Sequence, residues 1–302
     1  MQITIDEITN ALEKETYLAT EHIKYALYAS LLCDRPLLVE GDPGVGKTSL
    51  AKALANGLGL PFIRVQMYEG LTSDQILYDY DYQKQLLTLE AIRPSIERDY
   101  GSLPASEAVS AVVGGLDFFG EEFLVKRPVL RAIEGEQKVI LFDEIDKAPE
   151  ELEYMLYEFL ENYSITIPQK GEIVCAPDKH PIVFLTSNNY RELSGALKRR
   201  CNYLYIEQKS QKEVIEILKM KAGADDATAL GVARCLAVMR GEKLRYIPSV
   251  SEAVEYARFL SKNSEVTKEL AVNALGILIK DPRDIKAVTQ IVSENGELLW
   301  KK

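Results

Sequence analysis

Histidine and paired cysteine are scarce in this sequence of 302 residues. It contains two histidines, His22 and His180, which are too few for a histidine-rich metal site or for the histidine motif of a metalloprotease. Its four cysteines are widely separated and form no CxxC pair, so neither a zinc ribbon nor a thiol redox motif is present. A reduced compartment and buried free thiols fit this pattern.

Long apolar runs and an export signal are also absent. No stretch approaches the roughly 20 apolar residues that a membrane-spanning helix needs. Residues 1–10 carry two acids and lack the basic start and apolar core of a signal peptide. We therefore expect a soluble, cytoplasmic protein that does not associate with a membrane.

Positive charge is in deficit, because 36 Lys and Arg residues face 46 Asp and Glu residues, for a formal net charge of −10. Nucleic-acid-binding proteins usually carry a basic footprint, so this balance argues against broad contact with a phosphate backbone. A local basic pore remains compatible with it. We expect protein or nucleotide partners rather than DNA or RNA.

Apolar periodicity predicts an α/β domain at residues 1–207 and a smaller all-helical domain at residues 208–302. Short apolar runs typical of buried parallel strands lie at residues 36–40, 62–65, 138–142, 182–186 and 203–206. Helical patterns lie at residues 20–32, 47–58, 122–134 and 149–161. Thr20 is the expected N-cap of the first helix. Beyond residue 207 the strand signals stop, so we predict an αβα sandwich with a parallel sheet, followed by a helical lid.

Two segments interrupt the alternation of strands and helices. Residues 68–120 follow neither period well, although Tyr78, Tyr80 and Tyr82 alternate as they would on a strand. We interpret this segment as an insertion. Short β-like runs on either side of the turn-forming residues 168–171 predict a β-hairpin at about residues 164–175.

A glycine-rich loop lies between the first strand and the helix that follows it. Residues 41–48 read GDPGVGKT, which satisfies the phosphate-loop pattern GxxxxGK[ST] in the required strand–loop–helix context. Glycines let successive backbone N–H groups point at phosphate oxygens, and the helix N-terminus adds positive partial charge. Lys47 is expected to reach the β and γ phosphates, and Thr48 to ligate Mg²⁺. The residues predicted to bind ATP are Gly41, Asp42, Pro43, Gly44, Val45, Gly46, Lys47, Thr48 and Ser49.

Acidic residues follow the apolar strand at residues 139–142, at the end of a strand where α/β sheets bind ligands. Asp143 is expected to hold the Mg²⁺ hydration shell together with Thr48, and Glu144 to orient and deprotonate the attacking water. For Asp146, two roles stay open: capping the next helix, or acting on the nucleotide.

The motifs GDPGVGKT, FDEID and the later TSNN together resemble those of the AAA+ ATPases, and more narrowly of their MoxR branch. The phrases EGLTSDQILYDYDYQKQLL and LSGALKRRC are similar to accessory ATPases of that branch that are found beside carbon-monoxide dehydrogenase genes. The resemblance covers nearly the whole chain. It implies a P-loop NTPase fold with an insertion in helix 2, a hairpin before the strand that carries sensor 1, and a helical lid.

The same resemblance assigns roles to residues outside the phosphate loop. Asn188 in TSNN corresponds to sensor 1, whose amide contacts the γ-phosphate or the lytic water. Arg200 in ALKRRC takes the position of the arginine finger, with Arg199 as an unexpected neighbour. A finger lent to the next subunit implies a head-to-tail interface, which closes only as a ring.

Sensor 2 has no assignment in this sequence. Many relatives carry an arginine early in a lid helix, but Ser251 stands at that position here. Arg245 and Arg258 lie nearby, and both are displaced from it.

The resemblance implies a ring, expected to be a hexamer, that couples hydrolysis of ATP with Mg²⁺ to remodelling or maturing a protein client. It also implies a partner with a von Willebrand factor A domain. Two alternatives stay open: a nucleic-acid-directed AAA+ motor such as a helicase or clamp-loader relative, which the charge disfavours, and a nucleotide-gated scaffold with little turnover. Intact Lys47, Glu144 and Arg200 disfavour the scaffold. A GTPase is disfavoured because no N/TKxD motif lies in the expected place.

Overall fold

A parallel five-stranded sheet with the strand order β2-β5-β8-β1-β9 forms the centre of the molecule. The computed structural model describes residues 3–100, 104, 106–107, 117–263 and 265–300. The five strands are β1 (Leu37–Gly41), β2 (Phe62–Gln66), β5 (Val139–Asp143), β8 (Ile182–Ser187) and β9 (Asn202–Ile206). They confirm the predicted strands to within a residue. The order brings the carboxyl ends of β5, β8 and β1 together, where a parallel sheet binds its ligand.

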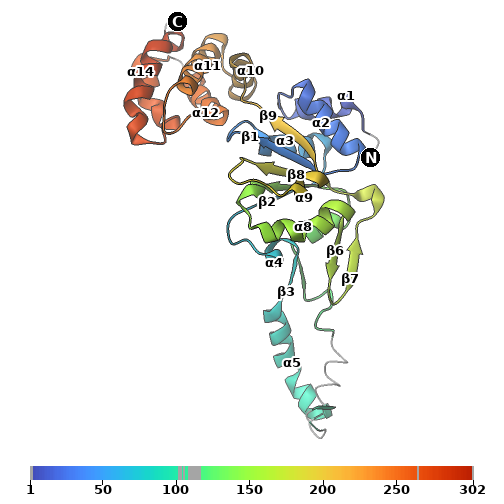
Figure 1. The fold of residues 1–302 in the computed structure, drawn as a ribbon. Helices are drawn as coiled ribbons and strands as arrows, with labels where there is room; N and C mark the ends of the chain where they lie inside the picture. Colours follow the sequence, from blue (N-terminus) through green and yellow to red (C-terminus); the bar gives the residue numbers. More distant parts are fainter. Residues whose placement is uncertain (1–2, 101–103, 105, 108–116, 264, 301–302) are drawn as a thin grey trace.

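Both faces of the sheet are covered by helices, because successive strand side chains alternate between two apolar clusters. Leu37 and Val39 belong to the cluster on one face, whereas Leu38 belongs to the cluster on the other. The first face packs against α1 (Ile5–Lys14), α2 (Glu21–Leu32) and α3 (Lys47–Leu58). The second packs against α7 (Pro128–Ile133), α8 (Glu150–Asn162) and α9 (Gly195–Arg200). The predicted αβα sandwich is thus confirmed (Figure 1).

One predicted helix is confirmed only in its second half. Instead of a helix at residues 122–134, the chain forms the short strand β4 (Leu124–Lys126) and then α7. The reason is Pro128, which starts α7 and forces the preceding Arg127 into an extended conformation with φ −80° and ψ 171°. By contrast, Thr20 caps α2 as predicted, accepting a hydrogen bond from the Ile23 amide at 3.4 Å.

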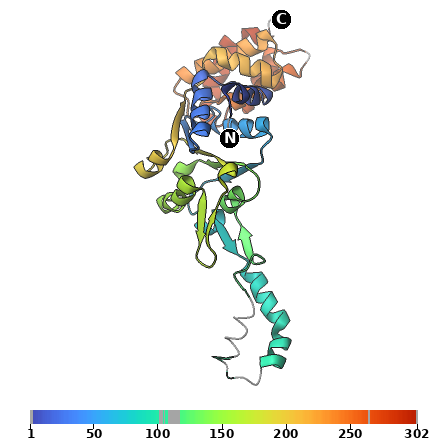
Figure 2. The same ribbon diagram turned by 90° about the vertical axis from the view of Figure 1, so that its right-hand side faces the viewer.

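The insertion forms an arm that leaves the sheet at its lower end, as both ribbon views show (Figures 1 and 2). Its base is the antiparallel pair of β3 (Tyr78–Tyr80) and β4, which confirms part of the strand expected from the alternating tyrosines. Between them lies α5 (Tyr82–Tyr100), a helix that sequence periodicity did not reveal, and α4 (Ser73–Ile76) precedes β3. Part of the predicted insertion, at residues 101–103, 105 and 108–116, falls outside the described residues.

The predicted hairpin is present, because β6 (Ser164–Ile167) and β7 (Gly171–Val174) pair in antiparallel fashion. Short 3₁₀ helices connect several of the longer elements. They are η1 (Ile145–Lys147), η2 (Pro177–Lys179), η3 (Ala274–Ile277) and η4 (Pro282–Asp284).

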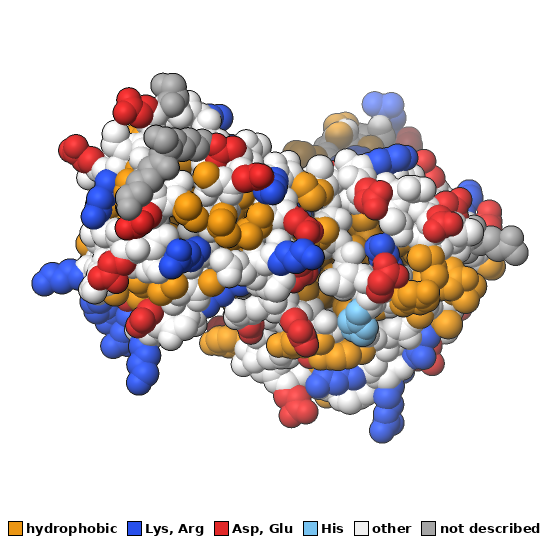
Figure 3. Space-filling view, turned by 90° about the horizontal axis from the view of Figure 1, so that it is seen from above, with side chains coloured by type: hydrophobic (Ala, Val, Ile, Leu, Met, Phe, Trp, Pro, Cys, Tyr) orange, Lys and Arg blue, Asp and Glu red, His pale blue; other side chains and the backbone are white. Residues whose placement is uncertain are grey.

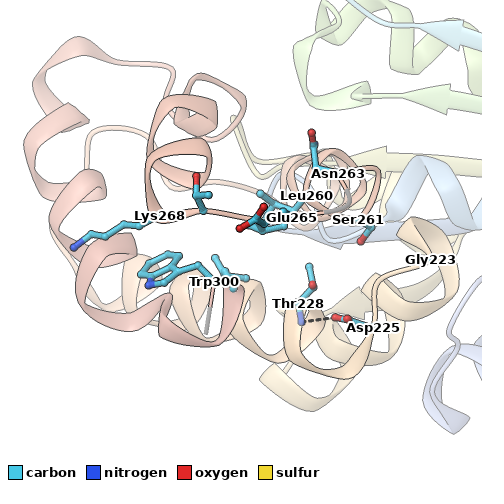
Figure 4. A pocket seen from close by; sticks show the side chains of 12 residues that line it. Gly223, Asp225, Thr228, Leu260, Ser261, Asn263, Glu265, Lys268 and Trp300 are labelled. Carbon is cyan, nitrogen blue, oxygen red and sulfur yellow. Dashed lines mark hydrogen bonds between the residues drawn. The ribbon is translucent and has the colours of Figure 1, made fainter. Parts of the chain in front are cut away.

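All described elements after Ile206 are helical and enclose a separate apolar cluster. They are α10 (Gln211–Ala222), α11 (Asp226–Gly241), α12 (Val250–Ser261), α13 (Lys268–Asn273), α14 (Ile285–Asn295) and α15 (Glu297–Trp300). A pocket inside this lid is lined by Thr228, Lys268 and Trp300 among others (Figure 4). Leu18, from the segment between α1 and α2, packs against the lid cluster and so joins the two parts.

Two surface properties bear on possible partners. None of the helices in the described part of the chain is long and apolar enough to cross a membrane. On the face seen from above, acidic side chains are distributed among the basic ones (Figure 3). That face therefore shows no continuous basic stripe of the kind that tracks a nucleic-acid backbone.

Candidate active site

The loop between β1 and α3 has the backbone of a phosphate cradle. Gly44 and Gly46 adopt positive φ angles of 80° and 102°, a conformation that glycine reaches without steric cost. A Cβ atom on Gly44 would also lie 2.4 Å from Cβ of Ser249, at the start of α12. The loop therefore needs glycine both to turn its amides inward and to let the lid pack directly against it.

Lys47 lies at the start of α3 with its ammonium group buried in this loop. The residue is 7% exposed, and its Nζ donates to the carbonyls of Gly41 at 2.6 Å and Asp42 at 2.9 Å. The third donor reaches Oδ1 of Asn188 at 2.7 Å. Burial lowers the pKa of Lys47, and the surrounding carboxylates, Asp146 foremost, partly offset that effect. Loop and side chain together present positive charge to a phosphate.

Asp143 ends β5 and is nearly surrounded by donors. The Thr48 hydroxyl donates to both carboxylate oxygens, at 2.9 and 3.1 Å, and the Thr186 hydroxyl donates to Oδ1 at 2.5 Å. The Arg64 guanidinium forms an ion pair with Oδ2 at 2.6 Å. The carboxylate and the Thr48 hydroxyl, contributed by segments 95 residues apart, thus lie in direct contact, and both oxygens could ligate a cation.

Glu144 follows directly, in a left-handed backbone conformation with φ 61° and ψ 51°. That turn aims its carboxylate at the cleft, because a non-glycine residue with positive φ leaves the line of the strand. Three donors hold it: Nδ2 of Asn188 at 3.0 Å, Nε2 of Gln66 at 2.9 Å and Nζ of Lys147 at 2.8 Å. Its backbone amide donates to Thr186 Oγ1 at 2.9 Å.

The side chain of Asn188 connects Lys47 with Glu144. Its Oδ1 accepts from Lys47 and its Nδ2 donates to Glu144, so one amide bridges the cation and the carboxylate. The residue directly follows β8, which lies between β1 and β5. The structure thus brings together Lys47, Glu144 and Asn188, which the sequence separates by up to 141 residues.

Asp146 does not cap the next helix, because the residue before α8 is Pro149 and Asp146 lies within η1. Its Oδ2 instead accepts from the backbone amides of Asn188 at 2.9 Å and Tyr190 at 2.8 Å. The side chain is almost wholly buried, at 1% exposure. Of the two roles left open, capping is therefore wrong, and Asp146 anchors the loop that carries Asn188.

The lid closes the other side of the cleft. A pocket lined by the glycine-rich loop, the two acids, Thr186 and Asn188 also includes Ser251 from α12. The position where an arginine was expected therefore does face the phosphate loop, and a serine occupies it. Neither Arg245 nor Arg258 lines this pocket. Arg258 lines a neighbouring, more apolar pocket together with Tyr17 and Val254.

Arg200 lies on α9, apart from the cleft of its own chain. Its guanidinium forms an ion pair with Glu161 at 2.7 Å and lies over the ring of Tyr157, 4.4 Å from the centroid. The Arg199 side chain is exposed, and its carbonyl accepts from Arg35. The structure thus brings together Lys47, Asn188 and the acid pair, Asp143 and Glu144. Neither Arg199 nor Arg200 joins them.

The residues of the cleft fit a triphosphate with Mg²⁺. Thr48 and Asp143 supply hydroxyl and carboxylate oxygens, the ligand type that Mg²⁺ prefers, and phosphates commonly complete such a shell. No group of three His, Cys, Asp or Glu side chains capable of holding a metal occurs in the described ranges.

Four contact residues escaped the sequence analysis: Arg64, Gln66, Lys147 and Thr186. A signal existed for the first two, because they occupy alternate positions at the carboxyl end of an otherwise apolar strand. Their proximity to the acid pair depends on β2 pairing with β5, with Gln66 in register with Asp143. Sequence periodicity does not reveal which strands pair.

Comparison with known proteins places these features in one family. The family model described as "ATPase family associated with various cellular activities (AAA)" matches residues 37–208. Lon protease 1 of Bacillus subtilis is 40% identical over 68 residues, or 21% of this chain and 8% of its own length. Midasin of Dictyostelium discoideum is 27% identical over 213 residues, or 67% of this chain and 3% of its own.

Two further matches are more limited. An uncharacterized AAA domain-containing protein of Schizosaccharomyces pombe is 39% identical over 61 residues, which are 20% of this chain and 8% of its own length. A solved structure of a Thermotoga maritima RuvB mutant is 18% identical, covers 99% of this chain and 73% of its own, and has a TM-score of 0.47, too low to support a conclusion. The chain spans less than a tenth of the length of the three curated relatives. Since the family model matches more than half of its residues, the chain belongs to the AAA family of ATPases.

Proposed function

We propose that this chain hydrolyses ATP in the cleft beneath α12 and uses the cycle to remodel or mature a protein client, as a MoxR-type member of the AAA family. The observation that carries the proposal is the bridge made by Asn188. Its amide lies 2.7 Å from Lys47 Nζ and 3.0 Å from the Glu144 carboxylate. A phosphate-binding cation and a general base are thereby held on either side of one polar side chain.

Each residue of the cleft has a distinct task in this proposal. Lys47 exchanges its bond to Asn188 for a phosphate oxygen, while its two carbonyl contacts keep the ammonium in the loop. Thr48 and Asp143 would hold Mg²⁺, which, when bound, neutralises charge on the phosphates. Glu144 accepts the proton of the attacking water, and Asn188 orients that water with its amide.

Arg200 is proposed as the finger that acts on the nucleotide of the neighbouring subunit. The Arg200 side chain is 28% exposed and its partner Glu161 57%, so the finger would exchange a half-exposed ion pair and the contact with Tyr157 for a phosphate. A finger supplied in trans needs a closed ring, which we propose to be a hexamer. Arg199, which is exposed, is the alternative finger.

Contact with a client is assigned to the arm and the hairpin, which project from the ATPase core (Figures 1 and 2). On α5, the side chains of Leu86 and Leu87 are 59% and 65% exposed, which provides an apolar contact surface. A partner with a von Willebrand factor A domain and a cytoplasmic location complete the proposal. The net charge of −10 argues against the alternative of a nucleic-acid-directed motor.

The proposal is tested with the Glu144→Gln variant, purified with ATP and Mg²⁺. Gln keeps the size of the side chain and one acceptor oxygen but cannot take a proton, so ATP should remain bound and the ring should persist. Light scattering should then report about six chains per particle, and pull-down from the native extract should recover one protein client. A particle of one chain with ATP bound would refute the ring. Turnover stimulated by added DNA or RNA would favour the nucleic-acid motor instead.

A further inference from the structure

Arg64 places a positive charge within the site, and no step of the proposed hydrolysis uses it. It lies on β2, two residues before Gln66, and the register of β2 with β5 directs both side chains toward the end of β5. Its Nε and Nη2 atoms lie 2.8 and 2.6 Å from Oδ2 of Asp143. The carboxylate proposed to hold Mg²⁺ is therefore engaged by a guanidinium.

The contacts of Asp143 leave little acceptor capacity for another cation. Its Oδ1 accepts from Thr186 at 2.5 Å and from Thr48 at 2.9 Å, while Oδ2 accepts from both nitrogens of Arg64 and, at 3.1 Å, from the same Thr48 hydroxyl. A carboxylate offers about four lone-pair sites in total. The Asp143 side chain is 4% exposed, so solvent screens its charge only weakly. A divalent cation and Arg64 must therefore compete for Oδ2.

Arg64 itself is able to leave. Its side chain is 49% exposed, so it can rotate into solvent without breaking a packed core. Its Nη2 also donates to Oε1 of Gln66 at 2.6 Å, so the guanidinium has a second neighbouring partner besides Asp143. The guanidinium is thus a removable counter-ion rather than a fixed structural one.

We propose that Arg64 sets the metal affinity of the site, competing with the divalent cation for Asp143 so that the metal binds tightly only when nucleotide phosphates add further ligands. This inference rests on the proposed function, because it takes Asp143 as a metal-holding residue. Arg64 acts through Asp143 and is a positioning residue. Its consequence is measurable as a metal affinity, independently of turnover.

The matched control is Lys147, which also contributes one positive charge to the acid pair. Its side chain is 42% exposed, close to the 49% of Arg64, but it pairs with Glu144 instead of Asp143. Replacing either residue by Met removes one charge and keeps an unbranched side chain. Only the Arg64 variant removes the competitor from the metal ligand.

The test titrates Mn²⁺ into the non-hydrolysable analogue AMP-PNP with and without the full chain and follows free Mn²⁺ by electron paramagnetic resonance, so that the Mn²⁺ held by the nucleotide alone is subtracted. Mn²⁺ suits the same oxygen ligands as Mg²⁺. Arg64→Met should lower the midpoint Mn²⁺ concentration by about tenfold, since a hydrogen bond to a charged group is worth that factor or more. Arg64→Lys should stay close to wild type, and Lys147→Met should shift the midpoint by less than about threefold.

An unchanged or raised midpoint in Arg64→Met would overturn the inference, as would an equal shift in Lys147→Met. Failure of the proposed function gives a different result, because wild-type protein would then bind no Mn²⁺ with AMP-PNP at any concentration. Measuring the affinity for AMP-PNP in EDTA, which removes the metal, shows whether Arg64 instead binds phosphate. A lower AMP-PNP affinity of Arg64→Met under these conditions would also refute the competition between Arg64 and the metal.

Discussion

Replacing Lys47 by Met tests the proposed contact between this side chain and the nucleotide. Lys47 is 7% exposed, and the three donors of its ammonium group meet Gly41, Asp42 and Asn188. In the ATP complex, one of those donors is proposed to turn to a phosphate oxygen. A hydrogen bond between charged groups is worth about 1.5 to 3 kcal/mol. ATP affinity should therefore fall about 10- to 150-fold.

The assay is fluorescence anisotropy with a labelled ATP analogue, and the control is Lys52→Met. Lys52 is exposed on the same helix, so this control makes the same charge change without touching the loop. Thermal unfolding of each variant reports whether the fold has survived. Equal ATP affinity in wild type and Lys47→Met would refute the proposed contact between Lys47 and the nucleotide. An equal loss of affinity in Lys52→Met would show that the change in net charge, and not that contact, lowers the affinity.

Three other expectations test separate parts of the account. Glu144→Gln should keep ATP affinity while turnover falls by about 10²- to 10⁴-fold, and turnover near wild type would rule it out as the base. Arg200→Ala should bind ATP without hydrolysing it. Mixing this variant with Lys47→Met should restore ATP hydrolysis only if Arg200 acts on the neighbouring subunit, and mixtures that stay inactive would favour a role within one chain. Burial raises the pKa of Cys201 to about 12, so at pH 8 iodoacetamide should label the exposed Cys33 and spare Cys201, as mass spectrometry of the peptides would show. Rapid labelling of Cys201 would contradict its burial.

The parts of the site that could be predicted from sequence are those set by local spacing. GDPGVGKT fixes a loop, a helix start and Lys47 within eight residues, and the apolar run before Asp143 identifies a buried strand. Both depend only on neighbours along the chain. For the same reason, the five sheet strands and the hairpin were located to within a residue or two.

The parts that escaped depend on contacts between distant segments. Arg64 matters only because β2 pairs with β5, a choice of strand order that periodicity does not encode. For Asp146, the sequence leaves open a helix cap or a role on the nucleotide, and neither predicts that the amides of the Asn188 loop, 42 and 44 residues away, bind it. Only the second half of the helix expected at residues 122–134 forms, for a local reason, because Pro128 forces the residue before it out of the helical conformation.

The central claim is that this cleft hydrolyses ATP, and release of phosphate from ATP by the purified chain tests it most directly. The account predicts release that requires Mg²⁺, rises per chain with protein concentration as rings assemble, and disappears in Glu144→Gln. Intact ATP recovered from wild-type protein at every concentration would contradict it.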